Sequence, residues 1–441
     1  MMQRSVTRRP QTSRLRNSAG TLGTTLLVQA IGLVTGAIAA RTLGVDGRGI
    51  LAALMVWSAG IANLGDLGGP VAYAYQSAEG DENRRQLARN ALSIVPVQSV
   101  GLIAVGLPIV ALVMSKYDGY GVLAIAYFSG FIPLNLFTRY MIAIHQGSQD
   151  FRKFNLVRIA LTASYAVALV VLFVAGVNQV KWVAAALLAS NVVAALVVVR
   201  GLDLKGAVHQ KFNRAKARAT FSYGMRAHIG NLTPIDSMQL DIALVVLFLG
   251  AREAGLYAVG IAAAGAIRTG GTAIGIVALP SVAAEPDHQR RAETIGLFFR
   301  GALVVVSLTA LVAFLAAHKL VPLIYGDEFS GAIPVVQILV LGIVAAALRQ
   351  VLGDCLRGAG MPMSGTVAEV ASWLVAVVAL ATLVPLFGAV GAAWAVSASY
   401  VAALLILMAI AHSNGIAWRT LLIPGHQDRD VFRQVVRYAR R

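Results

Sequence analysis

Charged residues are scarce in this chain of 441 residues. Asp, Glu, Lys and Arg together make up 13% of the sequence, whereas apolar residues make up 58%. A soluble globular protein has about one quarter charged residues, so this chain has too few charges to cover a water-facing surface of its size. The missing charge corresponds to surface that faces lipid, and the composition therefore predicts an integral membrane protein.

Cysteine and the common enzyme motifs are also missing. Cys355 is the only cysteine, which excludes a disulfide within the chain and a cysteine-based metal site. The sequence contains no Walker loop and no HExxH, CxxC or GxSxG motif. We therefore expect no enzyme activity, no cofactor and no metal site, and an ATP-driven pump would need a separate subunit.

What the chain has in abundance is apolar stretches of the length that crosses a bilayer, roughly 20 residues. The first follows a basic segment, as a signal peptide does, but it is long for one and eleven more stretches follow. The fold class predicted is all-α, with about twelve transmembrane helices near residues 22–40, 50–75, 91–114, 120–144, 155–176, 181–199, 223–249, 254–280, 295–317, 333–355, 364–386 and 389–411.

Lysine and arginine are concentrated on one side of these predicted spans. Of the 37 in the chain, the outer loops contain only Arg41, Arg48, Lys116, Lys181, Arg252 and Lys319. Positive loops mark the cytoplasmic side, so we expect a multi-pass protein of the bacterial cytoplasmic membrane with both termini in the cytoplasm. The net charge of +17 then reflects membrane topology, and we expect no nucleic-acid partner.

The chain repeats itself at a shift of 206 residues. Gly49 matches Gly255, and the pair Arg84 and Arg85 matches Arg290 and Arg291. Six spans per half give both halves the same orientation, which is a parallel repeat. The predicted organisation is a basic N-terminus at 1–21, an N-lobe at 22–200, a basic linker at 201–220, a C-lobe at 221–412 and a basic tail at 413–441.

Ionisable residues inside spans are costly and are candidates for function. Arg268 lies in the middle of the eighth span, beside Gly270 and Gly271. A guanidinium presents a planar fork of donors that fits phosphate oxygens, so an anion-binding role competes with a buried ion pair. Arg226, near the inner end of the seventh span, is a second candidate for the same anion.

Four other residues are candidates for coupling transport to a cation. Asp236 and Asp241 are five residues apart in the seventh span, so they point about 140° from each other on a helix. One of them could join Glu369 or Thr366 of the eleventh span in a Na⁺ or H⁺ site. For Asp241 we favour a local cap or pair.

Other intramembrane charges have structural explanations. Asp66 is expected where the second span bends at Gly68, and Arg139 and Arg349 occupy similar places in the two halves. For these two arginines, pairing within each lobe is favoured over ligand binding. The basic tail has an apolar face at helical spacing, and residues 427–441 are predicted to form an amphipathic helix on the inner membrane surface.

Several turns between spans resemble those of a known family. The segments are 40–49 (ARTLGVDGRG), 323–329 (LIYGDEF) and 383–393 (LVPLFGAVGAA). In order and spacing they are similar to the turns of Wzx-like polysaccharide and O-antigen flippases of the multidrug/oligosaccharidyl-lipid/polysaccharide (MOP) superfamily. The resemblance covers nearly the whole chain.

The resemblance implies two six-helix lobes in a V shape around a central cavity. It also implies a polyprenyl-diphosphate-linked oligosaccharide as cargo, membrane lipids as neighbours and a polysaccharide polymerase or other envelope-assembly protein as a partner. Arg268 lies where the peptidoglycan-precursor branch places a cavity arginine. Two features depart from that branch: the first span contains no arginine between Thr21 and Ala40, and the eleventh span reads Ser372-Trp373-Leu374 where such flippases often carry Asn.

The predicted function is therefore a flippase that moves a lipid-linked oligosaccharide from the inner to the outer leaflet by alternating access. One alternative is a drug or organic-cation antiporter of the same fold, which should have an acidic, aromatic-rich cavity. Another is a scaffold that does not transport and recruits envelope-assembly partners through its basic tail.

Overall fold

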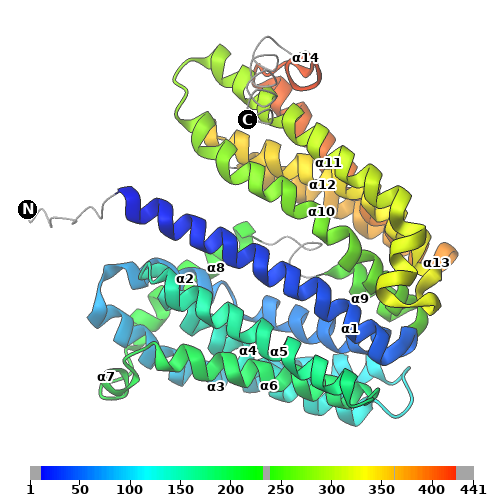
Figure 1. The fold of residues 1–441 in the computed structure, drawn as a ribbon. Coiled ribbons are helices and arrows are strands. Elements are labelled where there is room, and N and C mark those ends of the chain that lie inside the picture. The colour runs from blue at the N-terminus through cyan, green and yellow to red at the C-terminus, as the bar shows by residue number, and fades with distance from the viewer. Residues whose placement is uncertain (1–10, 232–238, 362, 424–441) are drawn as a thin grey trace, which may run out of the picture. The chain divides into compact units, whose positions relative to one another are not determined.

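The computed structural model describes residues 11–231, 239–361 and 363–423, and this part of the chain contains helices and no strands (Figure 1). The α-helices are α1 (Gln11–Gly65), α2 (Gly69–Gln76), α3 (Asp81–Met114), α4 (Gly121–Gly147), α5 (Phe151–Val174), α6 (Val180–Arg200), α7 (Leu204–Val208), α8 (Arg214–Asn231), α9 (Leu240–Phe248), α10 (Ala251–Ala283), α11 (His288–Tyr325), α12 (Ile333–Gly358), α13 (Met363–Ser413) and α14 (Trp418–Leu422). Short 3₁₀ helices occupy Ser77–Glu79 and Asp327–Ala332.

Eight of the described helical segments are long and apolar enough to cross a membrane. Two of them, in α1 and α13, each contain two predicted spans, so the eight segments hold ten of the twelve. The seventh predicted span falls on α8 and α9, and the eighth on α10. The prediction of an all-α, multi-pass membrane protein is confirmed.

Helices α1 and α13 each contain a glycine with positive φ that divides them. The φ angles are 67° at Gly44 and 60° at Gly388, a region that glycine enters without the steric cost of a Cβ. A Cβ on Gly391 would lie 2.0 Å from the carbonyl oxygen of Leu383, although eight residues of straight helix would separate them by about 12 Å. The chain of α13 therefore reverses direction at Gly388, as predicted for the turn between the last two spans.

The described chain divides into two compact units. Unit 1 contains residues 1–42 and 57–232, and unit 2 contains residues 43–56 and 233–441. This division differs from the predicted lobes in two places, because 43–56 groups with the second half and α8 groups with the first. The helix predicted to start near residue 223 starts at Arg214, so the basic linker is partly helical.

Unit 1 is a bundle in which α3 packs on α4, α5 on α6, and α4 on α6. The short helix α2 packs on both α4 and α8. Glycines permit the closest of these contacts. A Cβ on Gly147 of α4 would lie 1.8 Å from the carbonyl oxygen of Ala74 in α2, and one on Gly68 would lie 2.0 Å from that of Gly224 in α8. These contacts fix α8 against the bend that precedes α2.

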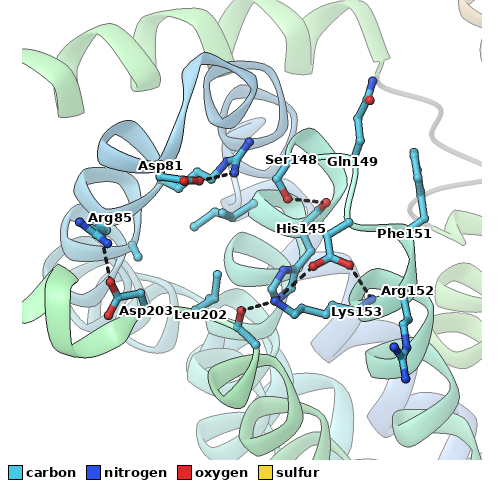
Figure 2. Close-up of a pocket in the computed structure, with 15 residues that line it drawn as sticks. Asp81, Arg85, His145, Ser148, Gln149, Phe151, Arg152, Lys153, Leu202 and Asp203 are labelled. Carbon is cyan, nitrogen blue, oxygen red and sulfur yellow. Dashed lines mark hydrogen bonds and ion pairs between the residues drawn. The ribbon is translucent and has the colours of Figure 1, made fainter. Parts of the chain in front are cut away.

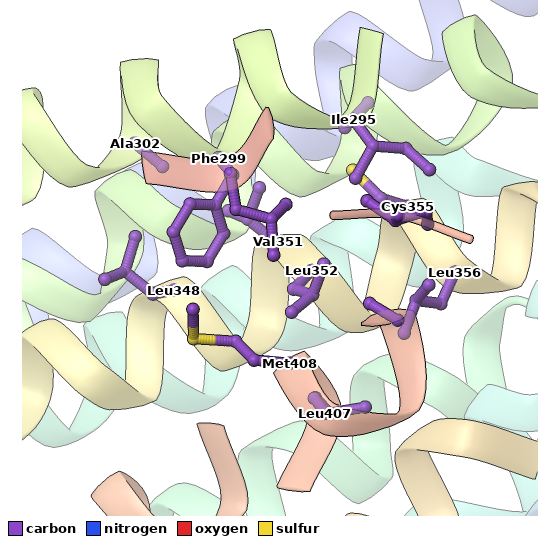
Figure 3. Close-up of a cluster of buried hydrophobic side chains, with 14 of the residues drawn as sticks. Ile295, Phe299, Ala302, Leu348, Val351, Leu352, Cys355, Leu356, Leu407 and Met408 are labelled. Carbon is purple, nitrogen blue, oxygen red and sulfur yellow. The ribbon is translucent and has the colours of Figure 1, made fainter. Parts of the chain in front are cut away.

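Unit 2 contains a core in which α10, α11, α12 and α13 meet (Figure 3). Phe299 of α11, Leu352 and Cys355 of α12 and Leu407 of α13 are at most 1% exposed there. Between membrane helices such contacts stabilise through close van der Waals packing rather than through withdrawal from water. Cys355, the only cysteine, is thus a small apolar core residue.

Residues 43–56 join unit 2 through a close crossing with α10. A Cβ on Gly49 would lie 1.7 Å from the carbonyl oxygen of Ala251, and one on Gly255 would lie 2.1 Å from that of Val45. The two backbones are therefore in direct contact, which only glycine permits at these two positions.

Candidate functional site

The first polar cluster of the membrane region surrounds Asp66, at the break between α1 and α2. Leu67 and Gly68 have φ angles of 53° and 71°, and the backbone N–H of Gly68 donates to Asp66 Oδ1 at 2.8 Å. An Asp side chain that bonds its own backbone two residues on is a common way to stabilise a turn. The predicted bend at Asp66 is confirmed, and the carboxylate, which is buried, helps to form it.

Two basic side chains reach this carboxylate from other helices of unit 1. Arg139 Nη2 lies 2.9 Å from Asp66 Oδ2, and His228 Nδ1 of α8 lies 3.6 Å from Asp66 Oδ1. Arg139 also donates to Asn63 Oδ1 at 2.5 Å. A buried carboxylate needs such partners, because desolvation of an isolated charge is very unfavourable. The prediction that Arg139 pairs within its lobe is confirmed.

The second half contains the corresponding pair. Arg349 of α12 forms an ion pair and a hydrogen bond with Glu369 of α13, and both side chains are largely buried. Arg357 pairs with Asp354 one turn earlier in α12, and Gln350 donates to the same carboxylate at 3.1 Å. Pairing of Arg349 within its lobe is therefore also confirmed.

Arg268 lies in α10 and is partly buried. The buried positions around it, Ala264, Ile267 and Gly271, recur at the spacing of one helix face. Gly271 contacts α12, where a Cβ would lie 2.7 Å from that of Ala347. Arg268 follows Ala264 by four residues and precedes Gly271 by three, so it lies within about 60° of both around the helix, on or beside the side that packs on α12.

Arg226, the second predicted anion ligand, lies in α8 and is exposed. Its Nε donates to the carbonyl oxygen of Ser222 at 3.2 Å. Arg226 belongs to unit 1 and Arg268 to unit 2.

The four predicted cation-coupling residues have different surroundings. Asp241 is buried in α9, where its Oδ2 accepts a hydrogen bond from Tyr257 at 2.9 Å, in line with the local pairing favoured for it. Glu369 is engaged by Arg349, and Thr366 is partly buried one turn before it. Asp236 lies outside the described residues.

A polar pocket of about 540 Å³ lies at the end of unit 1 where α3 and α5 begin (Figure 2). Arg85 Nε lies 2.8 Å from Asp203 Oδ2, and Lys153 Nζ lies 3.2 Å from Asp150 Oδ2. Asp203 Oδ1 also accepts from the N–H of Gly206 at 2.9 Å. This bond and the Arg85 guanidinium outweigh burial and lower the pKa of the Asp203 carboxyl. The charges of this pocket largely neutralise one another, which favours a structural role for these residues over ligand binding.

Sequence reasoning missed the contribution of His228 to the Asp66 cluster. The two residues are 162 positions apart, and His228 belongs to the segment predicted to begin the second lobe. The sequence around His228 contains no motif that points to Asp66. Only the packing of α8 on α2 brings the two side chains together.

Comparisons with known proteins agree on the fold. The model of the family "Polysaccharide biosynthesis protein" matches residues 15–285. No curated protein sequence matches.

Among solved structures, an inward-facing MATE-family multidrug resistance transporter of the MOP superfamily has a TM-score of 0.66 and 15% identity, covering 89% of this chain and 94% of its own. The lipid II flippase MurJ in an inward closed conformation has a TM-score of 0.68 and 10% identity, covering 88% and 86%. The MATE multidrug transporter DinF-BH has a TM-score of 0.60 and 14% identity, covering 96% and 99%.

Proposed function

We propose, from the premise that the chain belongs to the polysaccharide biosynthesis protein family, that it is a flippase for a lipid-linked oligosaccharide. The cargo would be carried on a polyprenyl diphosphate and moved from the inner to the outer leaflet by alternating access, without ATP hydrolysis by this chain. The observation that carries the proposal is the family match, which covers all of unit 1 from residue 15 and continues through the end of α10.

The basic residues within the membrane support an anionic cargo. Arg268 is only partly buried in α10. Arg226 is exposed in α8. We assign Arg268 to the diphosphate, because a guanidinium fork matches phosphate oxygens, and Arg226 to the first contact with the headgroup.

Three acidic residues in the described membrane helices argue against a drug or organic-cation antiporter. Such a protein needs carboxylates that are available to a cation. Asp66 and Glu369 are instead paired with arginines, and Asp241 accepts a hydrogen bond from Tyr257. These partners neutralise or satisfy the acids within their own units.

The test is transport of a fluorescent polyprenyl-diphosphate sugar in proteoliposomes. Arg268→Ala removes a charge-assisted contact of about 1.5–3 kcal/mol, so the flipping rate should fall about tenfold or more. Arg268→Lys should recover part of the rate, because an ammonium lacks the bidentate fork. Arg252→Ala is the matched control, since Arg252 is an exposed arginine at the start of the same helix.

Four other outcomes would lead to different conclusions. A well-inserted Arg268→Ala protein that flips at the wild-type rate would remove Arg268 from the cargo site. Low membrane levels of Arg268→Ala, restored when an acidic residue is neutralised as well, would show that Arg268 is half of a structural pair. Efflux of organic cations with no flipping would favour the antiporter, and normal polysaccharide export without any transport by the chain would favour the scaffold.

A further inference from the structure

An apolar groove of about 520 Å³ runs along unit 1 between α3 and α8. Its rims are formed by Val97 of α3, which is 74% exposed, and by Phe221 of α8, which is 52% exposed. Phe212, which precedes α8, and Ile94 line it between these rims. An exposed apolar surface of this kind suits contact with a hydrocarbon chain.

Most of the polar residues that line the groove have partners within the described part of the protein. At its base, Tyr140 donates to Gln98 Oε1 at 2.9 Å, Gln98 donates to the carbonyl oxygen of Gly65 at 2.5 Å, and Asp66 is held by Arg139. The hydroxyl of Thr220 donates to Gln76 Oε1 at 2.7 Å. A sugar would find few free donors or acceptors here, whereas a hydrocarbon chain needs none.

A cation lies at one end of the groove. Arg89 Nη1 donates to Oγ of the lining residue Ser93 at 2.8 Å, and Arg89 Nε donates to the carbonyl oxygen of Gln210 at 3.0 Å. No carboxylate among the described residues forms an ion pair with Arg89, and its Nη2 has no bond within that part of the chain. Two further basic residues lie nearby in the sequence: Lys211, in the segment between α7 and α8 that Arg89 contacts through Gln210, and Arg214, the first residue of α8. Both are exposed.

The dimensions fit one leaflet. Val97 follows Arg89 by eight residues of helix, which is about 12 Å along the axis, and half of the hydrocarbon core of a bilayer is about 15 Å. Arg89 lies at the end of α3 that is predicted to be cytoplasmic, where the surface carries anionic lipids.

We propose that this groove is a binding site for an anionic phospholipid of the inner leaflet. The phosphate is held by Arg89, with Lys211 and Arg214 beside it, and one acyl chain lies along α3 between Val97 and Phe221. The site is independent of the cargo site assigned to Arg268. If this lipid binds, it holds the segment between α7 and α8 against α3.

The test measures lipid retained by the delipidated full-length protein, using native mass spectrometry with phosphatidylglycerol and phosphatidylcholine of the same acyl chains. Wild type should retain phosphatidylglycerol preferentially, and Arg89→Gln should weaken its binding about tenfold, as loss of a charge-assisted contact does. Val97→Trp should weaken binding of both lipids because the indole fills the path of the chain. Val97→Trp breaks no internal hydrogen bond, so it remains informative if Arg89→Gln fails to fold.

Two control variants match these changes. Arg290→Gln removes an exposed arginine near the start of α11, and Val105→Trp adds an indole to a residue of α3 that is 69% exposed and lies outside the groove. Both should retain phosphatidylglycerol as wild type does. Unchanged binding in Val97→Trp, or equal loss in the controls, would overturn the site. Displacement of phosphatidylglycerol from the groove by farnesyl diphosphate at a lower concentration would assign the groove to the cargo's carrier and overturn the phospholipid.

Discussion

Gly49 and Gly255, which are equivalent in the 206-residue repeat, pack against each other's helices in a reciprocal contact. A Cβ on Gly49 would meet the carbonyl oxygen of Ala251 at 1.7 Å, and one on Gly255 would meet that of Val45 at 2.1 Å. Val45 and Ala251 are themselves equivalent in the repeat. Each half of the sequence therefore contributes the same two repeat positions to the crossing, which gives the crossing local twofold symmetry.

Gly255→Ala should lower the thermal stability of the purified protein. The added methyl group must displace backbone, and overpacking of this kind costs about 1–3 kcal/mol. Fluorescence-monitored thermal unfolding in detergent is the measurement. Gly265→Ala in the same helix is the control, because a Cβ there has no atom within 4 Å, and its stability should be unchanged or slightly higher.

Breaking the Asp66 cluster should destabilise unit 1. Arg139→Gln leaves the buried Asp66 carboxylate with His228 as its one basic partner among the described residues. We expect a loss of about 3 kcal/mol, at the low end of the range for buried pairs because the Arg139 side chain is 34% exposed. Asp66→Asn combined with Arg139→Gln should be more stable than Arg139→Gln alone. Additive losses in the double variant would show that the two residues do not act as a pair.

Substitution of Glu369 can distinguish a role in cation coupling from a structural role as the partner of Arg349. We expect Glu369→Gln to lower the melting temperature, since it leaves the largely buried Arg349 without its anion. Arg349→Gln in the same protein should restore part of that loss, while the dependence of flipping on Na⁺ and pH stays as in wild type. Loss of that dependence in Glu369→Gln, with stability retained, would instead support cation coupling at Glu369 and Thr366.

Acid should remove the contribution of Asp203 to stability. The pKa of its carboxyl in the folded protein is lowered by the Gly206 N–H and by Arg85, so the stabilisation is fully present above the unfolded pKa of about 3.9. It is lost as the pH falls through the lower folded pKa. The melting temperatures of wild type and Asp203→Asn should differ at pH 5 and converge at lower pH. A difference that stays constant with pH would exclude this ion pair as its source.

Much of the fold could be predicted because the bilayer imposes a length and a composition on every span. The same reasoning identified the bend at Asp66 and the pairing of Arg139 and Arg349, since a buried charge in a helix bundle must find a partner. The identity of a distant partner such as His228 depends on which helices pack together, and periodicity within one helix carries no information about that. The grouping of 43–56 with unit 2 was missed for the same reason, although the repeat had already singled out Gly49 and Gly255.

The chain reversal at Gly388 has a consequence for how the protein meets its surroundings. The turn is so tight that Gly391 touches Leu383, and Ala389 N–H is held by Glu253 Oε2 at 2.9 Å. In the predicted orientation this hairpin points out of the cell. A turn this short offers an extracellular protease no extended segment of backbone, which cleavage needs. Epitope tags for live-cell labelling therefore belong at Asp327–Ala332, where the chain between α11 and α12 is longest on that side.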